Sequence, residues 1–183
     1  GPFNVTLSSS PSSASPVPVA LSLGSNINRY QHITHALDAL SDAFGALVCS
    51  PVYESESVGF DGSNFLNSVV LITTTLGLDD IGPILKQIED DNGRDRNGPK
   101  FGPRTLDIDV LTYGDLVGEH HGIELPRRET ARNAFVLKPM ADILPDTRMP
   151  GSDLTYAQLW ANYPKEKQKL WAVPFEWRGR VLS

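Results

Sequence analysis

Two aspartates, Asp107 and Asp109, lie two residues apart in an otherwise apolar run from Leu106 to Leu111. In an extended strand, side chains two apart point to the same face, so the two carboxylates project together. Like charges held side by side are costly unless a cation lies between them, and carboxylate oxygens suit Mg²⁺. The pattern predicts a magnesium site on one face of a strand. The apolar residues around the pair then point the other way, into a core: Leu106, Ile108 and Val110.

A basic loop directly precedes the aspartates. It is interrupted by glycine and proline, and it carries four cations, Arg94, Arg96, Lys100 and Arg104. Arginine and lysine bind phosphate oxygens through charge-assisted hydrogen bonds. A solvated Asp-x-Asp pair beside an exposed charged loop is the ordinary alternative. The apolar face opposite the aspartates, together with four cations in one loop of an acidic chain, favours a site for a metal ion and a nucleotide.

The same stretch resembles a known family. The run from Lys100 to Leu111, Lys-Phe-Gly-Pro-Arg-Thr-Leu-Asp-Ile-Asp-Val-Leu, looks like the signature of 6-hydroxymethyl-7,8-dihydropterin pyrophosphokinase, a folate-pathway kinase. The resemblance covers about residues 18 to 145. Further matches follow in the same order, at Leu23-Gly24-Ser25-Asn26, Tyr53 to Gly59, Phe65-Leu66-Asn67, Ile88-Glu89 and Gly93-Arg94-Asp95-Arg96.

This resemblance implies a transferase that moves the pyrophosphoryl group of ATP to the hydroxymethyl oxygen of a reduced pterin. Two Mg²⁺ ions would be bound by Asp107 and Asp109, and the catalytic residues would be this pair together with Arg94, Arg96 and Arg104. The nucleotide would contact Glu89, Arg94, Lys100, Arg104, Arg127 and Arg128. The pterin would contact Ser55, Val58, Phe65, Asn67, Phe101 and Phe135, with Phe65 and Phe135 as its two aromatic walls.

Three places depart from the family pattern. Phe101 stands where a tryptophan is frequent, and Asn133 stands where an arginine is usual. Arg127 and Arg128 follow Pro126, at positions where the family usually shows a histidine and then an aromatic or another residue. Arginine can replace histidine as a phosphate donor but does not titrate near neutrality. We therefore expect intact magnesium and pterin residues with a shifted arrangement of cations around ATP.

The elements that position these residues alternate along the chain. Apolar spacing predicts strands at 17–23, 46–55 and 65–75, helices at 28–44 and 78–91, and then the strand of Asp107 and Asp109. This order predicts an α+β fold with a ferredoxin-like βαββαβ core, and the resemblance implies its elaboration into a three-layered α/β/α domain. A connecting segment that begins at Glu124 leads to residues 134–139, where Phe135 is either a core residue or the second aromatic wall, and 153–160 is interpreted as a short helix. The aromatic tail 170–177 must pack on the domain or on a partner.

Composition narrows the class of protein. The chain has 183 residues, 40% hydrophobic and 21% charged, with a net charge of -6 and one cysteine. These values are typical of one globular domain, and the acidic balance argues against a nucleic-acid partner. No apolar run is long enough for a bilayer, and one cysteine permits no internal disulfide, so we expect a cytoplasmic protein. We also favour a monomer. Residues 1–16, rich in Ser and Pro and without the pattern of a secretory signal, are predicted to be a disordered arm or tag remnant before a single domain at 17–183.

Other functional classes stay open on this reasoning. One is a diverged paralogue that acts on a related pterin or on another acceptor. A second is a non-catalytic ferredoxin-like binding module, such as an RNA binder, and a third is an inactive regulator. The acidic charge and the lack of a Lys/Arg-Gly-aromatic motif count against the RNA binder. The retained carboxylates and arginines count against the regulator.

Overall fold

The computed structural model describes residues 15–56, 63–93 and 105–183 of the chain. None of the helices in these ranges has the length and the apolar character that crossing a bilayer requires. The elements are, in chain order, β1 Val17–Ser25, α1 Arg29–Phe44, β2 Val48–Cys49, β3 Val52–Ser55, β4 Phe65–Thr74, α2 Leu78–Asp91, β5 Asp107–Tyr113, β6 Gly118–His120, β7 Ile123–Leu125, the 3-10 helix η3 Arg128–Ala131, α3 Ala134–Ile143, α4 Tyr156–Ala161, the 3-10 helix η4 Lys165–Lys167, β8 Leu170–Val173, β9 Glu176–Trp177 and β10 Arg180–Val181.

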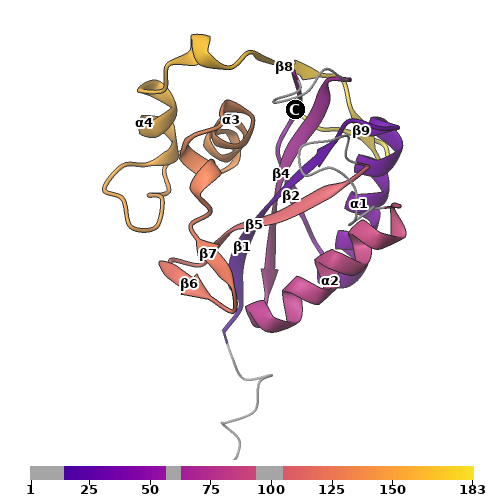
Figure 1. The fold of residues 1–183 in the computed structure, drawn as a ribbon, viewed down its shortest axis with the longest axis horizontal. Helices are drawn as coiled ribbons and strands as arrows, with labels where there is room; N and C mark the ends of the chain where they lie inside the picture. Colours follow the sequence, from indigo (N-terminus) through magenta and orange to yellow (C-terminus); the bar gives the residue numbers. More distant parts are fainter. Residues whose placement is uncertain (1–14, 57–62, 94–104) are drawn as a thin grey trace, which may run out of the picture.

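A six-stranded sheet forms the centre of the fold (Figure 1). Its main path runs β5-β1-β4-β3-β8, and β2 also pairs with β4. Every pairing along this path is antiparallel. Strand β1 lies between β4 and β5, and its residues from Val19 to Gly24 have partners on both sides. Gly24 of β1 faces Asn67 of β4 on one side and Asp107 of β5 on the other.

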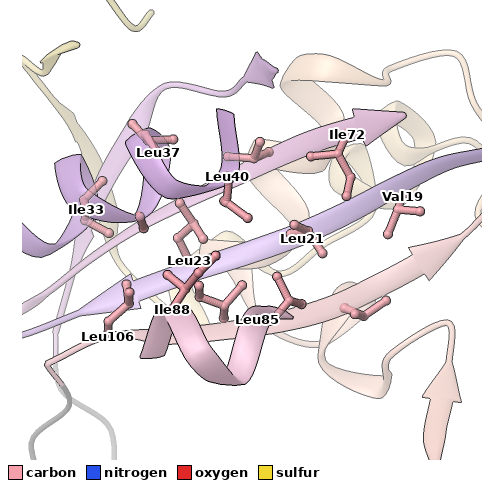
Figure 2. Close-up of a cluster of buried hydrophobic side chains, with 14 of the residues drawn as sticks. Val19, Leu21, Leu23, Ile33, Leu37, Leu40, Ile72, Leu85, Ile88 and Leu106 are labelled. Atoms are coloured by element: carbon pink, nitrogen blue, oxygen red, sulfur yellow. The ribbon is translucent and has the colours of Figure 1, made fainter. Parts of the chain in front are cut away.

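The larger hydrophobic core lies between the sheet and helices α1 and α2 (Figure 2). Alternate residues of β1 point into it, and both helices contribute side chains at helical spacing. Because burying one such side chain stabilises the fold by about 1.5–3 kcal/mol, the core strongly favours this strand register. Its almost wholly buried members include Val19, Leu21, Leu23, Ile33, Leu37, Leu40, Ile72, Leu85, Ile88 and Leu106.

The opposite face of the sheet is covered by α3 and α4, on the side away from α1 and α2 (Figure 1). A polar contact also joins α3 to β3, as the Tyr53 hydroxyl donates to the carboxylate of Asp142. Within α3, Lys138 Nζ donates to the same carboxylate at 2.6 Å. This face therefore carries a smaller core beside polar groups. The core consists of Ala20, Val69, Leu111, Val136, Leu137, Met140 and Tyr156.

Most of the predicted strands and helices are confirmed within a few residues, but the strand predicted at 46–55 is divided in two. The interruption falls at Ser50 and Pro51, because proline has no N–H to donate to a neighbouring strand. The hydroxyl of Ser50 accepts from the Val69 N–H at 2.9 Å, and the Ser50 N–H donates to the Val69 carbonyl at 2.9 Å. Ser50 thus keeps both backbone groups of Val69 satisfied across the break.

Helix α3 covers residues 134–139, for which the sequence analysis predicts neither helix nor strand. Pro139 lies inside the segment Ala134–Ile143, and a proline within an apolar run argues against a continuous helix when only the sequence is considered. The short helix predicted at 153–160 is confirmed with a later start, as α4 begins at Tyr156. Its start is set by Thr155, which forms a reciprocal capping box with Gln158.

The aromatic tail packs on its own domain. Strand β8 pairs with β3 at the edge of the sheet, and Phe175 and Trp177 are buried in the larger core. The ring of Phe175 stacks on Tyr30 of α1 with ring centroids 5.6 Å apart. The indole N–H of Trp177 donates to Asp38 of the same helix at 3.0 Å. The tail therefore covers the end of the sheet and one side of α1.

The buried position of Phe175 predicts a large effect on stability. Phe175→Ala removes a ring that is 4% exposed, and we expect the free energy of unfolding to fall by about 3–5 kcal/mol. The matched control is Val181→Ala in the same tail, because Val181 is 64% exposed and its loss is expected to cost less than about 0.5 kcal/mol. Urea unfolding followed by tryptophan fluorescence measures both. Equal small effects would contradict the packing of the tail.

Candidate functional site

The two aspartates lie at the start of β5 and project from the sheet face that α3 covers. Asp107 and Asp109 alternate with Leu106 and Ile108, which are buried in the larger core, so the pattern predicted from the sequence is confirmed. Asp109 faces Ser22 of β1. Directly opposite residues in an antiparallel pair share a face, so the small side chain of Ser22 lies on the same face as the carboxylates.

The environment of the pair disfavours two negative charges. Burial first, and then the charge of Asp107, raise the pKa of Asp109 from 3.8 to about 7, although the side chain is 31% exposed. Arg127 acts in the opposite direction, and the charges of Glu89 and Glu129 add to the increase. The pair is thus a place where an added cation relieves repulsion, which is the electrostatic property of a cation site.

Glu89, which sequence reasoning assigned to the nucleotide, lies buried at the end of α2. Its Oε2 accepts a hydrogen bond from the backbone N–H of Ile108 at 2.8 Å. Ile108 stands between the two aspartates, so this bond joins the end of α2 to β5 at the point where the carboxylates project. A contact between Glu89 and a nucleotide stays a prediction.

The two arginines after Pro126 have different surroundings. Arg127 lies against the pair, with Nη2 at 3.4 Å from Asp109 Oδ1 and Nε at 3.4 Å from Glu129 Oε1. Arg128 points elsewhere and pairs with Glu124 at 3.1 Å, with 60% of its side chain exposed. The structure therefore brings Arg127, and not Arg128, to the aspartates. Sequence reasoning missed Glu129, whose only signal is its position two residues after Arg127.

The predicted pterin residues that the structure describes are divided between the strands and α3. Asn67 Nδ2 donates to the Ser55 hydroxyl at 2.8 Å, and both side chains are buried. A Cβ placed on Gly24 would lie 3.6 Å from Asn67 Oδ1 and 3.9 Å from the Phe65 ring, so a larger side chain there would cover both groups. Phe135 lies in α3 and packs partly buried against the smaller core.

Strand register brings these groups together. Tyr53, Asn67, Gly24 and Asp107 are successive partners across β3, β4, β1 and β5. All four therefore lie in one row on the face that α3 covers, with the amide and the first carboxylate separated by the glycine. The other predicted site residues lie outside the described residues, and their roles stay predictions: Arg94, Arg96, Lys100, Arg104, Val58 and Phe101.

Two further observations bear on metal and ligand binding. In the described ranges, no group of three or more His, Cys, Asp or Glu side chains is arranged to hold a metal ion. A polar hollow of about 490 Å³ lies near the end of β1 and the start of β4, and none of the predicted site residues lines it. Its charged groups already pair with one another, as Arg29 Nη1 lies 3.1 Å from Glu54 Oε2. The row through Gly24 is therefore the better candidate site. The hollow is lined by Asn26, Asn28, Arg29, Glu54, Ser63 and Asn64.

Comparisons with known proteins agree on one family. Residues 20–145 match the model of the 7,8-dihydro-6-hydroxymethylpterin-pyrophosphokinase family (HPPK). A 2-amino-4-hydroxy-6-hydroxymethyldihydropteridine pyrophosphokinase of Pseudomonas aeruginosa is 36% identical over 136 residues, which are 72% of this chain and 83% of that protein. A folate synthesis bifunctional protein of Chlamydia trachomatis is 35% identical over 161 residues, 80% of this chain and 36% of that protein.

A solved structure supports the fold. The HPPK-DHPS chain of Plasmodium falciparum superposes with a TM-score of 0.66 at 13% identity, over 91% of this chain and 50% of that one. The chain thus spans a third to a half of these bifunctional relatives and most of the Pseudomonas enzyme. The family match and the relatives above 30% identity show that the chain belongs to the 7,8-dihydro-6-hydroxymethylpterin-pyrophosphokinase family and is a pyrophosphokinase of folate biosynthesis.

Proposed function

We propose that the row Asn67–Gly24–Asp107 is the centre of the active site, where the pyrophosphoryl group of ATP is transferred to the hydroxymethyl oxygen of 6-hydroxymethyl-7,8-dihydropterin. The observation that carries this proposal is the strand register, which sets a buried amide beside a carboxylate pair with a glycine between them. One side of the row suits a flat heterocycle and the other suits a charged phosphate chain. The hydroxymethyl group of a bound pterin would then point from the amide toward the carboxylates.

The amide side has the properties that recognition of a pterin edge needs. Because Ser55 accepts from Asn67 Nδ2, the orientation of the amide is set before a ligand binds. Asn67 offers both donor and acceptor atoms to a heterocycle that carries both. Phe65 neighbours this amide on the same strand face and supplies a flat apolar surface, and Phe135 is assigned as the opposing ring. Val58 and Phe101 complete the proposed pterin residues.

The carboxylate side has the properties of a magnesium site. Asp107 and Asp109 provide oxygen ligands. The pKa of Asp109 is raised first by burial and then by the charge of Asp107, and a divalent cation would relieve the repulsion between the two carboxylates. Two carboxylates are the number that Mg²⁺ commonly uses when phosphates and water supply its remaining ligands. We assign two such ions, which when bound would neutralise charge on the phosphate oxygens during transfer.

The chain's own residues position the reactants around these groups. Glu89 holds β5 through the Ile108 N–H and so orients both aspartates. Arg127 lies beside Asp109, within reach of an anion bound there. Arg94, Arg96, Lys100 and Arg104 are assigned to the phosphates on the basis of charge, and Arg128 is assigned to the outer end of the nucleotide. Transfer of a phosphoryl group requires little covalent chemistry from protein, so positioning and charge provide most of the acceleration.

We also infer the finer architecture and state of the protein. The strand order β5-β1-β4-β3 supports a ferredoxin-like βαββαβ core with β8 added at its edge. The two hydrophobic cores on opposite faces support three layers, and the packing of the tail on α1 supports one domain over residues 17–183. We propose that it acts as a cytoplasmic monomer without a nucleic-acid or membrane partner. A diverged acceptor, rather than a loss of catalysis, is the second candidate, because Arg127 and Asn133 stand where the family has other residues.

Replacement of either aspartate tests the catalytic assignment. We expect Asp107→Asn and Asp109→Asn each to lower the rate of pterin-dependent AMP release by about a hundredfold or more, because charge neutralisation at the phosphates is lost. Asp115→Asn, at an exposed turn after the same strand, is the control and should retain the rate. Release of ADP in place of AMP, or full activity of both variants, would contradict the proposed reaction and site.

Replacement of the amide tests the pterin assignment separately. Asn67→Ala should weaken binding of the pterin by about tenfold, since a buried hydrogen-bonding edge is lost, while ATP binding should change little. Asn64→Ala is the matched control, because Asn64 contacts Glu54 and lies outside the row. Calorimetric titration with 6-hydroxymethyl-7,8-dihydropterin measures both. An unchanged pterin affinity in Asn67→Ala would remove this residue from the site.

The raised pKa of Asp109 predicts a pH dependence of stability. Between 3.8 and about 7 the folded state holds a proton that the unfolded state has released. The protonation of Asp109 in the folded state therefore adds fully to the free energy of unfolding below pH 3.8, and this stabilisation is lost as the pH rises through about 7. In EDTA, Asp109→Asn should become more stable relative to the wild type between about pH 5 and about pH 8. Thermal unfolding measures this difference, with Asp115→Asn as the control. A difference that does not change with pH would contradict the shift.

A further inference from the structure

Arg127 lies between two acidic side chains in the structure. Its guanidinium approaches Asp109 through Nη2 and Glu129 through Nε, each at 3.4 Å. The side chain of Arg127 is 36% exposed, that of Asp109 31% and that of Glu129 47%. One cation is thus shared between a carboxylate of the proposed magnesium pair and a carboxylate outside it.

The backbone of Arg127 is held in place beside β5. Its N–H donates to the carbonyl of Leu111 at 2.8 Å, and its own carbonyl accepts from the Thr130 N–H at 3.0 Å. Leu111 follows Asp109 by two residues on the same strand, so the anchor and the carboxylate are neighbours on β5. A fixed backbone with a long, partly exposed side chain lets the guanidinium change partner without moving the fold.

We propose that Arg127 is an internal counter-ion that competes with the divalent cation for Asp109 and that Glu129 receives its charge when the cation binds. This inference rests on the proposed magnesium role of the pair. A divalent ion and a guanidinium repel each other at one carboxylate, so metal binding favours movement of Arg127 from Asp109 toward Glu129. Glu129 lowers the cost of that displacement because it already contacts the same guanidinium.

The consequence is a lowered affinity for the metal ion alone. Arg127 partly neutralises the pair before any ligand arrives, and the attraction between the pair and a free cation is correspondingly weaker. Arg127 is therefore a positioning residue that sets the metal affinity of Asp107 and Asp109. Arg128 serves as an internal comparison, because it carries the same charge one residue later and pairs with Glu124 at 3.1 Å instead.

Binding of Mn²⁺ to the nucleotide-free protein tests this inference, measured by electron paramagnetic resonance or calorimetry. Arg127→Ala should bind Mn²⁺ about fivefold more tightly than the wild type, a change of the size expected for a partly exposed ion pair. Arg127→Lys should restore most of the wild-type affinity, since it retains the charge. Arg128→Ala should differ from the wild type by less than about twofold, and the gain in Arg127→Ala should shrink at high salt.

Glu129 provides a second, independent measurement. Glu129→Ala should weaken Mn²⁺ binding more in the wild-type background than in Arg127→Ala, because only in the former does it take up the arginine's charge. Unchanged or weaker Mn²⁺ binding in Arg127→Ala, with binding still lost in Asp109→Asn, would overturn this inference and leave the magnesium site standing. Wild-type Mn²⁺ affinity in both Asp107→Asn and Asp109→Asn would instead overturn the proposed site itself.

Discussion

The antiparallel pairing of β1 with β4 on one side and β5 on the other is the constraint on which the site depends. It sets Gly24 between Asn67 and Asp107, and it does so only in the observed register. A shift of one residue would turn Leu21 and Leu23 away from the larger core and turn the polar row into it. The buried leucines therefore determine where the amide and the carboxylate stand, although they contact neither.

A second constraint follows from the charges that this register brings together. Asp107 and Asp109 share a face by strand geometry alone, and burial makes their repulsion stronger. Arg127 partly offsets this repulsion at Asp109. Glu89 accepts a hydrogen bond from the N–H of Ile108, the residue between the two aspartates, and so holds this part of β5 in place. Among the described residues, Arg127 lies against Asp109, and Glu89 and Glu129 add negative charge near the same carboxylate. Such an arrangement favours a ligand that brings divalent cations and phosphates together.

The remaining elements pack on the two faces of the sheet and support the strands that carry the site. Helix α3 is attached beside the row by its apolar residues and by the contact from Tyr53 to Asp142. On the other face, Phe175 and Trp177 of the aromatic tail pack in the larger core, and Phe175 stacks on Tyr30 of α1. The polar hollow near Arg29 and Glu54, in contrast, holds charges that satisfy each other, so it offers less to a charged ligand than the aspartate pair does.

The sequence is enough to predict the order of the elements as far as β5 and the shared face of the two aspartates, and to recognise the family. These depend on periods of 2.0 and 3.6 residues and on a long local motif, which are properties of neighbouring residues. It does not indicate helix α3, because Pro139 interrupts the apolar segment that forms it. It also did not separate Arg127 from Arg128 or identify Glu129. The arginine that meets Asp109 and the strand residue between Asn67 and Asp107 are visible only in the folded chain, because these contacts join segments far apart in the sequence and depend on register and packing.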